Sequence, residues 1–168
     1  ARQRAAEAGV APEFHQAAAE TFHDDRLFDA AICLFTTLGQ LSADGDNLGL
    51  LGNAFRLLRP GARLAVETPQ RDVTVRTMKA FERFEGPNNA AEVTRSFDAA
   101  SSVLSEVFEV GSDGASQRFV LRYRLFSAAE LTALLLDAGF VAVELTDGYD
   151  DAPLHNDSPA MLAIASKP

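Results

Sequence analysis

The chain has 168 residues, of which 47% are hydrophobic and 23% are charged, and its formal net charge is −9. This length is enough for one domain with a real core, and the acidic balance argues against a nucleic-acid partner, because neutralising phosphates needs a basic surface. No apolar run approaches the ~20 residues that cross a membrane and no signal peptide is visible, so we expect a cytoplasmic protein without a membrane partner.

The first expected elements lead to a buried strand. Residues 2–8 look helical, with Gly9 as a left-handed stop, and residues 13–17 are a short strand candidate. Residues 29–34 form the opening strand, in which the acid Asp29 is followed by an unbroken apolar run; such a run is typical of a strand buried on both faces in a parallel sheet. Ligands bind at the carboxyl edge of such sheets, so residues 34–40 are the first place to look for chemistry.

A strand, a helix and a second strand follow with short connections. A helix is expected over residues 46–58, because its apolar residues recur at helical spacing, and Arg59-Pro60-Gly61 ends it. Residues 63–68 form the next strand. This pattern predicts a parallel pair joined by a right-handed crossover.

Residues 69–126 break this rhythm and read as an antiparallel insert. We expect a helical turn at 78–84, a turn cluster at 86–89, extended chain over 93–110 and a hairpin loop at 111–114. The return strand alternates, which gives it one apolar and one basic face. The apolar face carries Phe119, Leu121, Tyr123 and Leu125, and the basic face carries Arg118, Arg122 and Arg124.

The last third predicts a helix and a terminal hairpin. Ser127 and Glu130 form a capping box, and Gly139 ends the helix so that Phe140 folds back on Leu135. Residues 141–145 and 161–165 are the last two strands, which we expect at the edge of the sheet.

Several common sites are excluded by their motifs. The sequence has no Gly-x-Gly-x-x-Gly after a strand, no Gly-x-x-x-x-Gly-Lys and no Gly-x-Ser-x-Gly. The three histidines are far apart, and the single Cys33 excludes a disulfide and a cysteine cage, so no metal site is expected.

Four segments in order carry a resemblance to a known family. The family is the class I S-adenosylmethionine-dependent methyltransferases of the small-molecule type. Its fourth strand and following loop are similar to residues 28–41, and its Leu-Arg-Pro-Gly turn is similar to residues 57–64. The helix before its sixth strand is similar to residues 126–140, and its final strand is similar to residues 161–168. The chain resembles the carboxyl-terminal two-thirds of such an enzyme. The resemblance implies methyl transfer from S-adenosyl-L-methionine to a small-molecule substrate.

The resemblance also implies an α/β fold. It is a Rossmann-like, mostly parallel sheet in the order 3-2-1-4-5-7-6, with helices on both faces, an antiparallel last strand and residues 69–126 as a lid. Residues 1–168 would then be one partial domain whose first two strands, glycine-rich loop and ribose-binding acid lie upstream of Ala1. We expect such a fragment to be inactive, and to be unstable or to aggregate, because the opening strand would have an unpaired edge.

The resemblance assigns the site residues, and no catalytic residue is among them. Ala18 stands where the family has an adenine-binding acid; Ala19 offers a backbone amide, and Glu20 is a possible substitute. Leu34, Phe35 and Leu38 would border the cofactor, and Thr36, Thr37, Arg71, Arg122 and Arg124 would contact the substrate. Plain packing for Phe35, a helix cap for the threonines and a solvated strand face for the arginines remain open.

Two other functions remain open. One is a Rossmann enzyme that uses a nicotinamide or nucleotide-sugar cofactor, although an antiparallel last strand fits it less well. The other is a degenerate or truncated domain that binds a partner without catalysis, which the absent glycine-rich loop and Ala18 both favour. The sequence predicts neither the methyl acceptor nor the oligomeric state.

Overall fold

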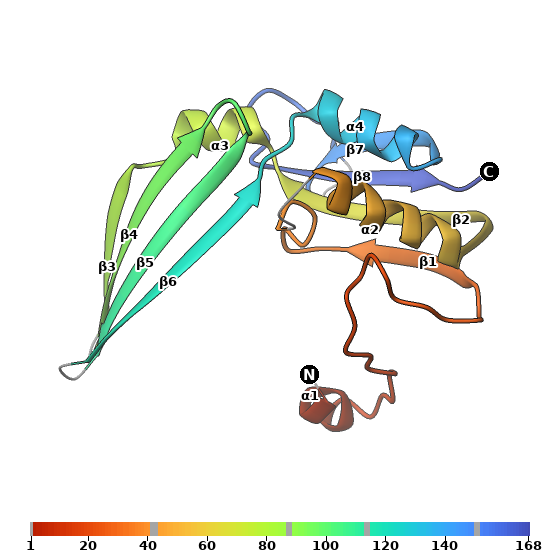
Figure 1. Ribbon diagram of the computed structural model, residues 1–168, viewed down its shortest axis with the longest axis horizontal. Coiled ribbons are helices and arrows are strands. Elements are labelled where there is room, and N and C mark those ends of the chain that lie inside the picture. Colours follow the sequence, from red (N-terminus) through yellow and green to blue (C-terminus); the bar gives the residue numbers. More distant parts are fainter. Residues whose placement is uncertain (1, 41–43, 87–88, 113–114, 150–151) are drawn as a thin grey trace.

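The computed structural model describes residues 2–40, 44–86, 89–112, 115–149 and 152–168. Within these ranges the chain forms two four-stranded sheets, and the second projects sideways from the first (Figure 1). None of the described helices is long and apolar enough to cross a bilayer.

The main sheet has the strand order β1-β2-β8-β7. The strands are β1 (Phe28–Cys33), β2 (Leu58–Pro69), β7 (Val141–Asp147) and β8 (Ala160–Ser166). β1 and β2 are parallel, whereas β8 is antiparallel to both of its neighbours. The order agrees with the last four places that the resemblance implies, and the terminal hairpin is confirmed. The sheet is mixed, however, and not mostly parallel, because β8 enters between two strands that run the same way.

Two helices cover one face of this sheet, α2 (Asp44–Leu57) and α4 (Ala128–Asp137) (Figure 1). Between them and the sheet lies the core. The phenyl rings of Phe55 and Phe140 meet edge to face, with centroids 5.1 Å apart. Fully buried side chains of the core include Leu38, Leu51, Leu64, Val66, Leu131, Leu135 and Met161.

The opposite face of the sheet is open in the described part of the chain. Ile32 of β1 has 72% of its surface exposed, and neither α1 nor α3 lies over this face of the sheet (Figure 1). The outer edge of β1 has no partner strand among the described residues. The expectations of helices on both faces and of a strand buried on both faces are therefore wrong here, because nothing described covers that side of β1.

The insert forms the second sheet. After α3 (Arg71–Thr77) come β3 (Phe81–Glu85), β4 (Asn89–Asp98), β5 (Val103–Ser112) and β6 (Ala115–Arg124), each antiparallel to the next. The antiparallel insert is confirmed, but one local expectation is wrong: residues 78–84 are not a helical turn, because 81–85 pair with β4. The extended chain expected over 93–110 is confirmed, but it is divided into two strands, because the Asp98 carboxylate accepts bonds from Ala100 N and Ser101 Oγ and closes a turn. The turns expected at 86–89 and 111–114 lie partly outside the described residues.

The capping box and the glycine end of α4 are confirmed, whereas α2 ends at Leu57 and residues 59–61 belong to β2. Ser127 and Glu130 form the capping box of α4. At its end Gly139 has φ +100°, and Phe140 N donates to Leu135 O, which completes a Schellman motif. Lys167 Nζ donates to the carbonyls of Phe55 and Leu58, both at 2.8 Å, and so neutralises the end of α2.

The amino-terminal part lies beside α2 and outside the sheet. α1 (Arg2–Glu7) and the left-handed Gly9 are confirmed. Residues 13–17 are not a strand, because they pair with no strand in the described part of the chain.

The open face of β1 predicts a specific effect on self-association. Ile32→Lys should raise the monomeric fraction in size-exclusion chromatography, because it removes an exposed apolar side chain beside a free strand edge. The free energy of unfolding should change by less than about 0.5 kcal/mol, as for other exposed positions. Leu136→Lys is the control, since Leu136 is 51% exposed on α4 and lies away from this face. Equal effects of both variants would contradict a role for the β1 face.

Candidate functional site

The loop that follows β1 has a strained backbone. Phe35 and Thr36 have φ of +57° and +58°, in the left-handed region that residues with a Cβ rarely adopt. Two such residues in succession persist only where their surroundings hold them, and they tend to occur at functional sites. The loop lies at the carboxyl end of β1, where an α/β sheet binds ligands.

Glu67 of β2 holds this loop from one side. Its Oε2 accepts a hydrogen bond of 2.7 Å from Phe35 N. The Tyr149 hydroxyl also bonds to Glu67; burial, followed by the nearby Glu67 charge, raises the pKa of Tyr149. The Phe35 side chain is 82% exposed, so Glu67 fixes the backbone while the ring stays accessible.

Gly39 joins the loop to the insert. Its N–H donates to Oδ1 of the buried Asn47 at 2.8 Å, and its carbonyl accepts from Arg124 N at 2.7 Å. Gly39 has φ +97°, and a Cβ built on it would lie 2.3 Å from the Arg124 carbonyl oxygen. Only glycine fits this contact, which brings the end of β6 against the loop of the main sheet.

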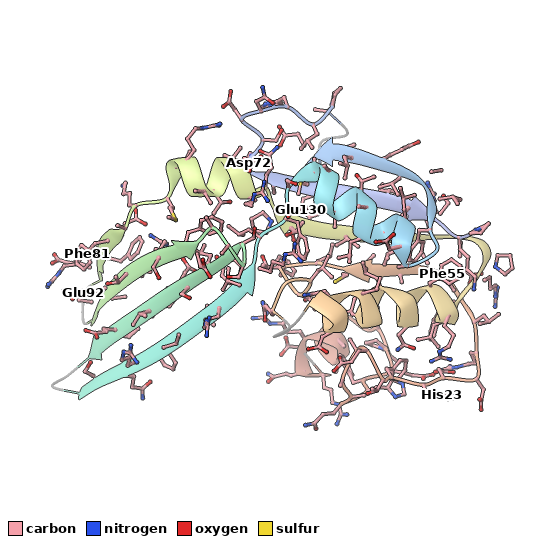
Figure 2. The ribbon with its side chains drawn as sticks, turned by 45° about the horizontal axis from the view of Figure 1, so that its top comes forward. His23, Phe55, Asp72, Phe81, Glu92 and Glu130 are labelled. Atoms are coloured by element: carbon pink, nitrogen blue, oxygen red, sulfur yellow. The ribbon has the colours of Figure 1, made fainter. Side chains whose placement is uncertain are left out.

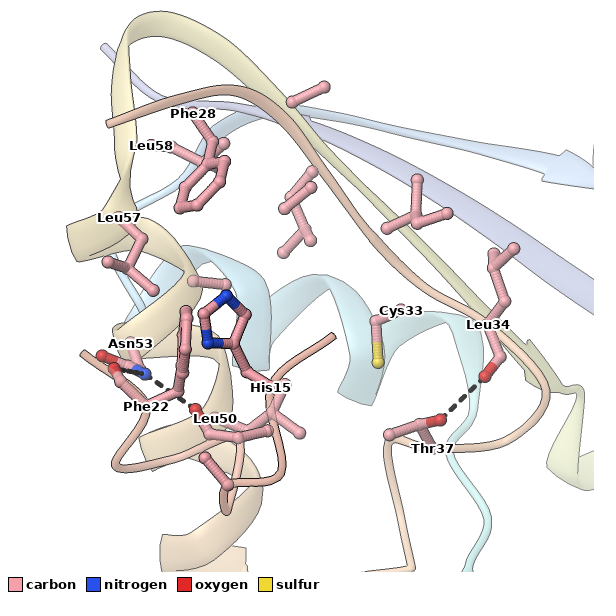
Figure 3. A pocket seen from close by; sticks show the side chains of 17 residues that line it. His15, Phe22, Phe28, Cys33, Leu34, Thr37, Leu50, Asn53, Leu57 and Leu58 are labelled. Carbon is pink, nitrogen blue, oxygen red and sulfur yellow. Dashed lines mark hydrogen bonds between the residues drawn. The ribbon is translucent and has the colours of Figure 1, made fainter. Parts of the chain in front are cut away.

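A cavity of about 500 Å³ lies between β1, α2 and residues 15–22 (Figure 3). His15, Phe22 and Asn53 stand on one side, and Cys33, Leu34 and Thr37 on the other. The Thr37 hydroxyl donates to Leu34 O at 2.8 Å, which closes the turn and shows that it is not a helix cap. Further lining residues are Ala17, Ala19, Phe28, Ala30, Ala31, Ile32, Leu50, Ala54, Leu57, Leu58 and Leu64. The walls are largely apolar, as in most small-molecule sites.

Residues 13–26 are tied together by one arginine and a ring contact. Arg26 donates to both carboxylate oxygens of Glu13, at 2.9 and 2.7 Å, and also to Asp24. Hydrogen bonds from Arg26, then from His15, lower the pKa of Glu13 from 4.5 to about 2. The rings of His15 and Phe22 lie 5.2 Å apart.

Glu130 connects the insert to α4 (Figure 2). Its carboxylate pairs with Arg71 and with Arg124, and it accepts a hydrogen bond from Ser127 N. Burial raises the pKa of Glu130, but the Ser127 hydrogen bonds and the two arginine charges outweigh burial, so the pKa is lowered overall. The helix cap thus also holds the insert in place.

The structure brings some of the predicted site residues together. Ala19, Leu34 and Thr37 line one cavity. Ala18 O accepts from Thr21 N, and the Glu20 side chain lies against Gly49 of α2. Leu38 is fully buried in the core and does not line the cavity.

The three arginines have different surroundings. Arg71 and Arg124 both pair with Glu130, and the Arg124 guanidinium also lies 4.9 Å from the centre of the Phe126 ring. Arg122 is exposed on β6, opposite Ser105. Arg71 and Arg124 therefore have a structural role at the junction, and Arg122 is the arginine most accessible to an anion.

Four residues that hold the site were not predicted from the sequence. They are Asn47, Asn53, Glu67 and, as the partner of Arg71 and Arg124, Glu130. Asn47 and Asn53 are only 1% and 9% exposed. Both occur among the leucines of an amphipathic helix, and a polar residue at such positions is the one signal that could have indicated them. Within the described residues, no group of three His, Cys, Asp or Glu side chains could hold a metal ion.

Comparisons with known proteins identify the fold. No protein-family model matches the chain, and no curated protein sequence matches it. Among solved structures, an S-adenosylmethionine-dependent methyltransferase from Clostridium acetobutylicum aligns with a TM-score of 0.86 at 10% identity, over 99% of this chain and 69% of that one. The CcbJ methyltransferase from Streptomyces caelestis aligns at 0.83 and 20% identity, over 99% and 68%.

A third match was solved with its cofactor. S-adenosylmethionine-bound CalS10, an amino pentose methyltransferase from Micromonospora echinaspora, gives 0.64 at 19% identity, over 90% of this chain and 63% of that one. The chain therefore has the class I methyltransferase fold and spans about two thirds of the matched proteins.

The Gly39 contact predicts opposite effects for one substitution at two glycines. Gly39→Ala should destabilise the protein by about 3 kcal/mol, because the new Cβ meets the Arg124 carbonyl and φ is positive. Gly52→Ala should be neutral or stabilising by about 0.5–1 kcal/mol, since nothing lies within 4 Å of its Cβ position on α2. Urea unfolding measures both. Similar values for the two would show that the contact is not tight.

The ion pair between Glu13 and Arg26 predicts that the stability of residues 13–26 depends on pH. The folded pKa of Glu13 lies below its unfolded value, so the pair supports residues 13–26 above pH 4.5 and loses that contribution as the pH falls to about 2. Because both side chains are exposed, salt should weaken the effect. NMR titration of the Glu13 carboxyl measures its pKa, and Arg26→Gln should return that pKa towards 4.5. A wild-type midpoint near 4.5 would contradict the pairing.

Proposed function

We propose that the protein transfers a methyl group from S-adenosyl-L-methionine to a small molecule. The observation that carries this proposal is the alignment of nearly the whole chain with structures of methyltransferases. It is supported by the meeting of Ala19 and Leu34, which the resemblance assigns to the cofactor, at one cavity by the carboxyl end of β1.

The residues of the cavity fit the adenosine end of this cofactor. The volume of about 500 Å³ lies within the range of about 300–1,000 Å³ that small-molecule sites span. Apolar walls from Phe22, Leu34 and Leu50 suit a planar purine. Among the described residues, no hydrogen bond occupies the Ala19 backbone amide, which leaves a donor for a ring nitrogen. Ala18 offers no carboxylate, and the purine amino group would lack that partner.

The chain positions the reactants and excludes water from the reaction. S-adenosyl-L-methionine, when bound, supplies an electrophilic methyl group on a sulfonium centre. Transfer to an acceptor depends on in-line placement and exclusion of water more than on a strong acid or base. Glu67 and Gly39 fix the loop at Phe35 and Thr36, and a fixed loop is what such placement requires. This agrees with a site in which no catalytic acid or base is assigned.

We place the substrate between this loop and the insert, with the insert as a lid. CalS10 is an amino pentose methyltransferase, which supports a small-molecule acceptor here too. Thr36 and Thr37 lie on the loop, and Arg122 is the candidate for an anionic group of the substrate. Arg71 and Arg124, which already share Glu130, would act on the substrate through the position of the lid.

The full-length protein would complete the cofactor site at the edge of β1. The sequence has no glycine-rich loop after a strand, the outer edge of β1 has no described partner, and the matched proteins are longer than this chain. We propose that the missing first two strands and their glycine-rich loop pair there. The antiparallel β8 supports this function over a nicotinamide or nucleotide-sugar enzyme, whereas Ala18 favours a module that binds without catalysis.

Calorimetric titration with S-adenosylhomocysteine separates these functions. The full-length protein should bind it with a dissociation constant in the micromolar range, and the present chain at least tenfold more weakly, because it lacks the loop that holds the amino-acid end. NAD is the control ligand and should not bind. Failure of the full-length protein to bind S-adenosylhomocysteine would refute an active methyltransferase and favour the non-catalytic module, and binding of NAD instead would favour the other enzyme class.

A further inference from the structure

We propose that Asn53 and Arg56 of α2 are positioning residues that hold residues 17–22 at the cavity, and that they thereby set the affinity for the adenosine end of the cofactor. This inference rests on the proposed function. It assigns a role to two side chains that lie more than thirty positions away in the sequence from the carbonyl groups they bind.

The side-chain amide of Asn53 uses all of its hydrogen-bonding capacity. Its Nδ2 donates to the carbonyls of Ala19 and Phe22, at 2.7 and 2.8 Å. Its Oδ1 accepts from Nε and Nη2 of Arg56, at 3.1 and 2.8 Å. Two carbonyls on one side and two N–H donors on the other fix which way the amide points. Asn53 is only 9% exposed, so these bonds are partly buried.

One face of α2 carries the whole contact. Arg56 Nη2 adds a bond of 3.0 Å to the Phe22 carbonyl, so that carbonyl accepts from two side chains. One turn before Asn53, Gly49 faces Glu20. A Cβ added to Gly49 would lie 3.7 Å from the Glu20 Cβ. Residues 49, 53 and 56 are spaced by four and three, which places them on one side of the helix.

The segment has few other restraints. Residues 13–22 form no strand or helix, so no ladder of backbone bonds holds them. The Glu13–Arg26 pair is more than half exposed at both partners, and exposed pairs contribute little. Thr21 N bonds to Ala18 O, but this bond is local and does not fix the segment to the rest of the protein. The bonds to Asn53 and Arg56 of α2 are therefore its main anchor.

The anchored segment forms one wall of the cavity. Ala17, Ala19 and Phe22 line it, opposite Leu34 of the loop after β1 (Figure 3). Loss of the Asn53 bonds would let this wall move away from Leu34. A purine held between the two walls would then lose contacts, while the loop at Phe35 and the insert would stay in place.

Asn53→Asp is the sharpest test. It keeps the size of the side chain and its contact with Arg56, but it removes both donors and sets a carboxylate against two carbonyl oxygens. Limited proteolysis between residues 15 and 26 of the full-length protein, followed by mass spectrometry, should become about tenfold faster, with no change at residues 141–147. The dissociation constant for S-adenosylhomocysteine should rise about tenfold. Arg56→Gln should act in the same direction, with a smaller effect.

Asn156→Asp is the matched control. It makes the same chemical change in an exposed loop and should alter neither measurement. Unchanged proteolysis between residues 15 and 26 in Asn53→Asp would overturn the anchoring role, and faster proteolysis with unchanged affinity would overturn the link to the cofactor. If the wild-type protein itself fails to bind S-adenosylhomocysteine, the proposed function falls, and the link to the cofactor falls with it. Should Asn53→Asp not fold, Arg56→Gln carries the same comparison.

Discussion

The contact between Gly39 and Arg124 is the constraint on which the two-sheet arrangement depends. Their backbones are so close that no side chain fits between them, and an N–H···O bond of 2.7 Å joins them. Through this contact the end of β6 meets the loop after β1, and Glu130 secures the same region from α4. The insert is therefore fixed at its base, while its strands project away from the main sheet (Figure 1). An insert fixed at its base keeps one position relative to the loop after β1.

Both walls of the candidate site are held by polar side chains instead of by regular structure. Glu67 and Asn47 bond to the backbone of the loop after β1, and Asn53 bonds to the backbone of residues 19–22. Irregular backbone needs such partners, because its polar groups cannot pair within a helix or sheet. A buried amide that lost its partner would in turn cost about 1–3 kcal/mol. The walls and the helix thus stabilise each other, which gives a defined cavity without secondary structure.

Local signals made the elements predictable where they existed. Ser127, Glu130 and Gly139 act on their own neighbours, so the bounds of α4 could be read from the sequence. α3 could not, because four of its seven residues, Val73, Thr74, Val75 and Thr77, are β-branched and disfavour a helix. Tertiary contacts decide there: Arg76 binds Asp157 in the β7–β8 loop. The loop at Leu34–Thr37 could be located from the topology of the sheet. The roles of Asn53 and Glu67 could not be predicted in this way, because their partners are distant in the sequence and almost no local pattern marks them.

The strand β1 has a free edge and also lines the candidate cavity. Ala30 and Ala31 line the cavity and belong to the strand whose outer edge is unpaired. A strand added at that edge would add a wall to the cavity, so pairing and ligand binding would stabilise the same state. A ligand that binds only this state raises its stability in proportion to RT ln(1 + [L]/Kd). Cofactor affinity and the tendency of the protein to self-associate through the β1 edge should therefore change together, because both depend on whether that edge is occupied.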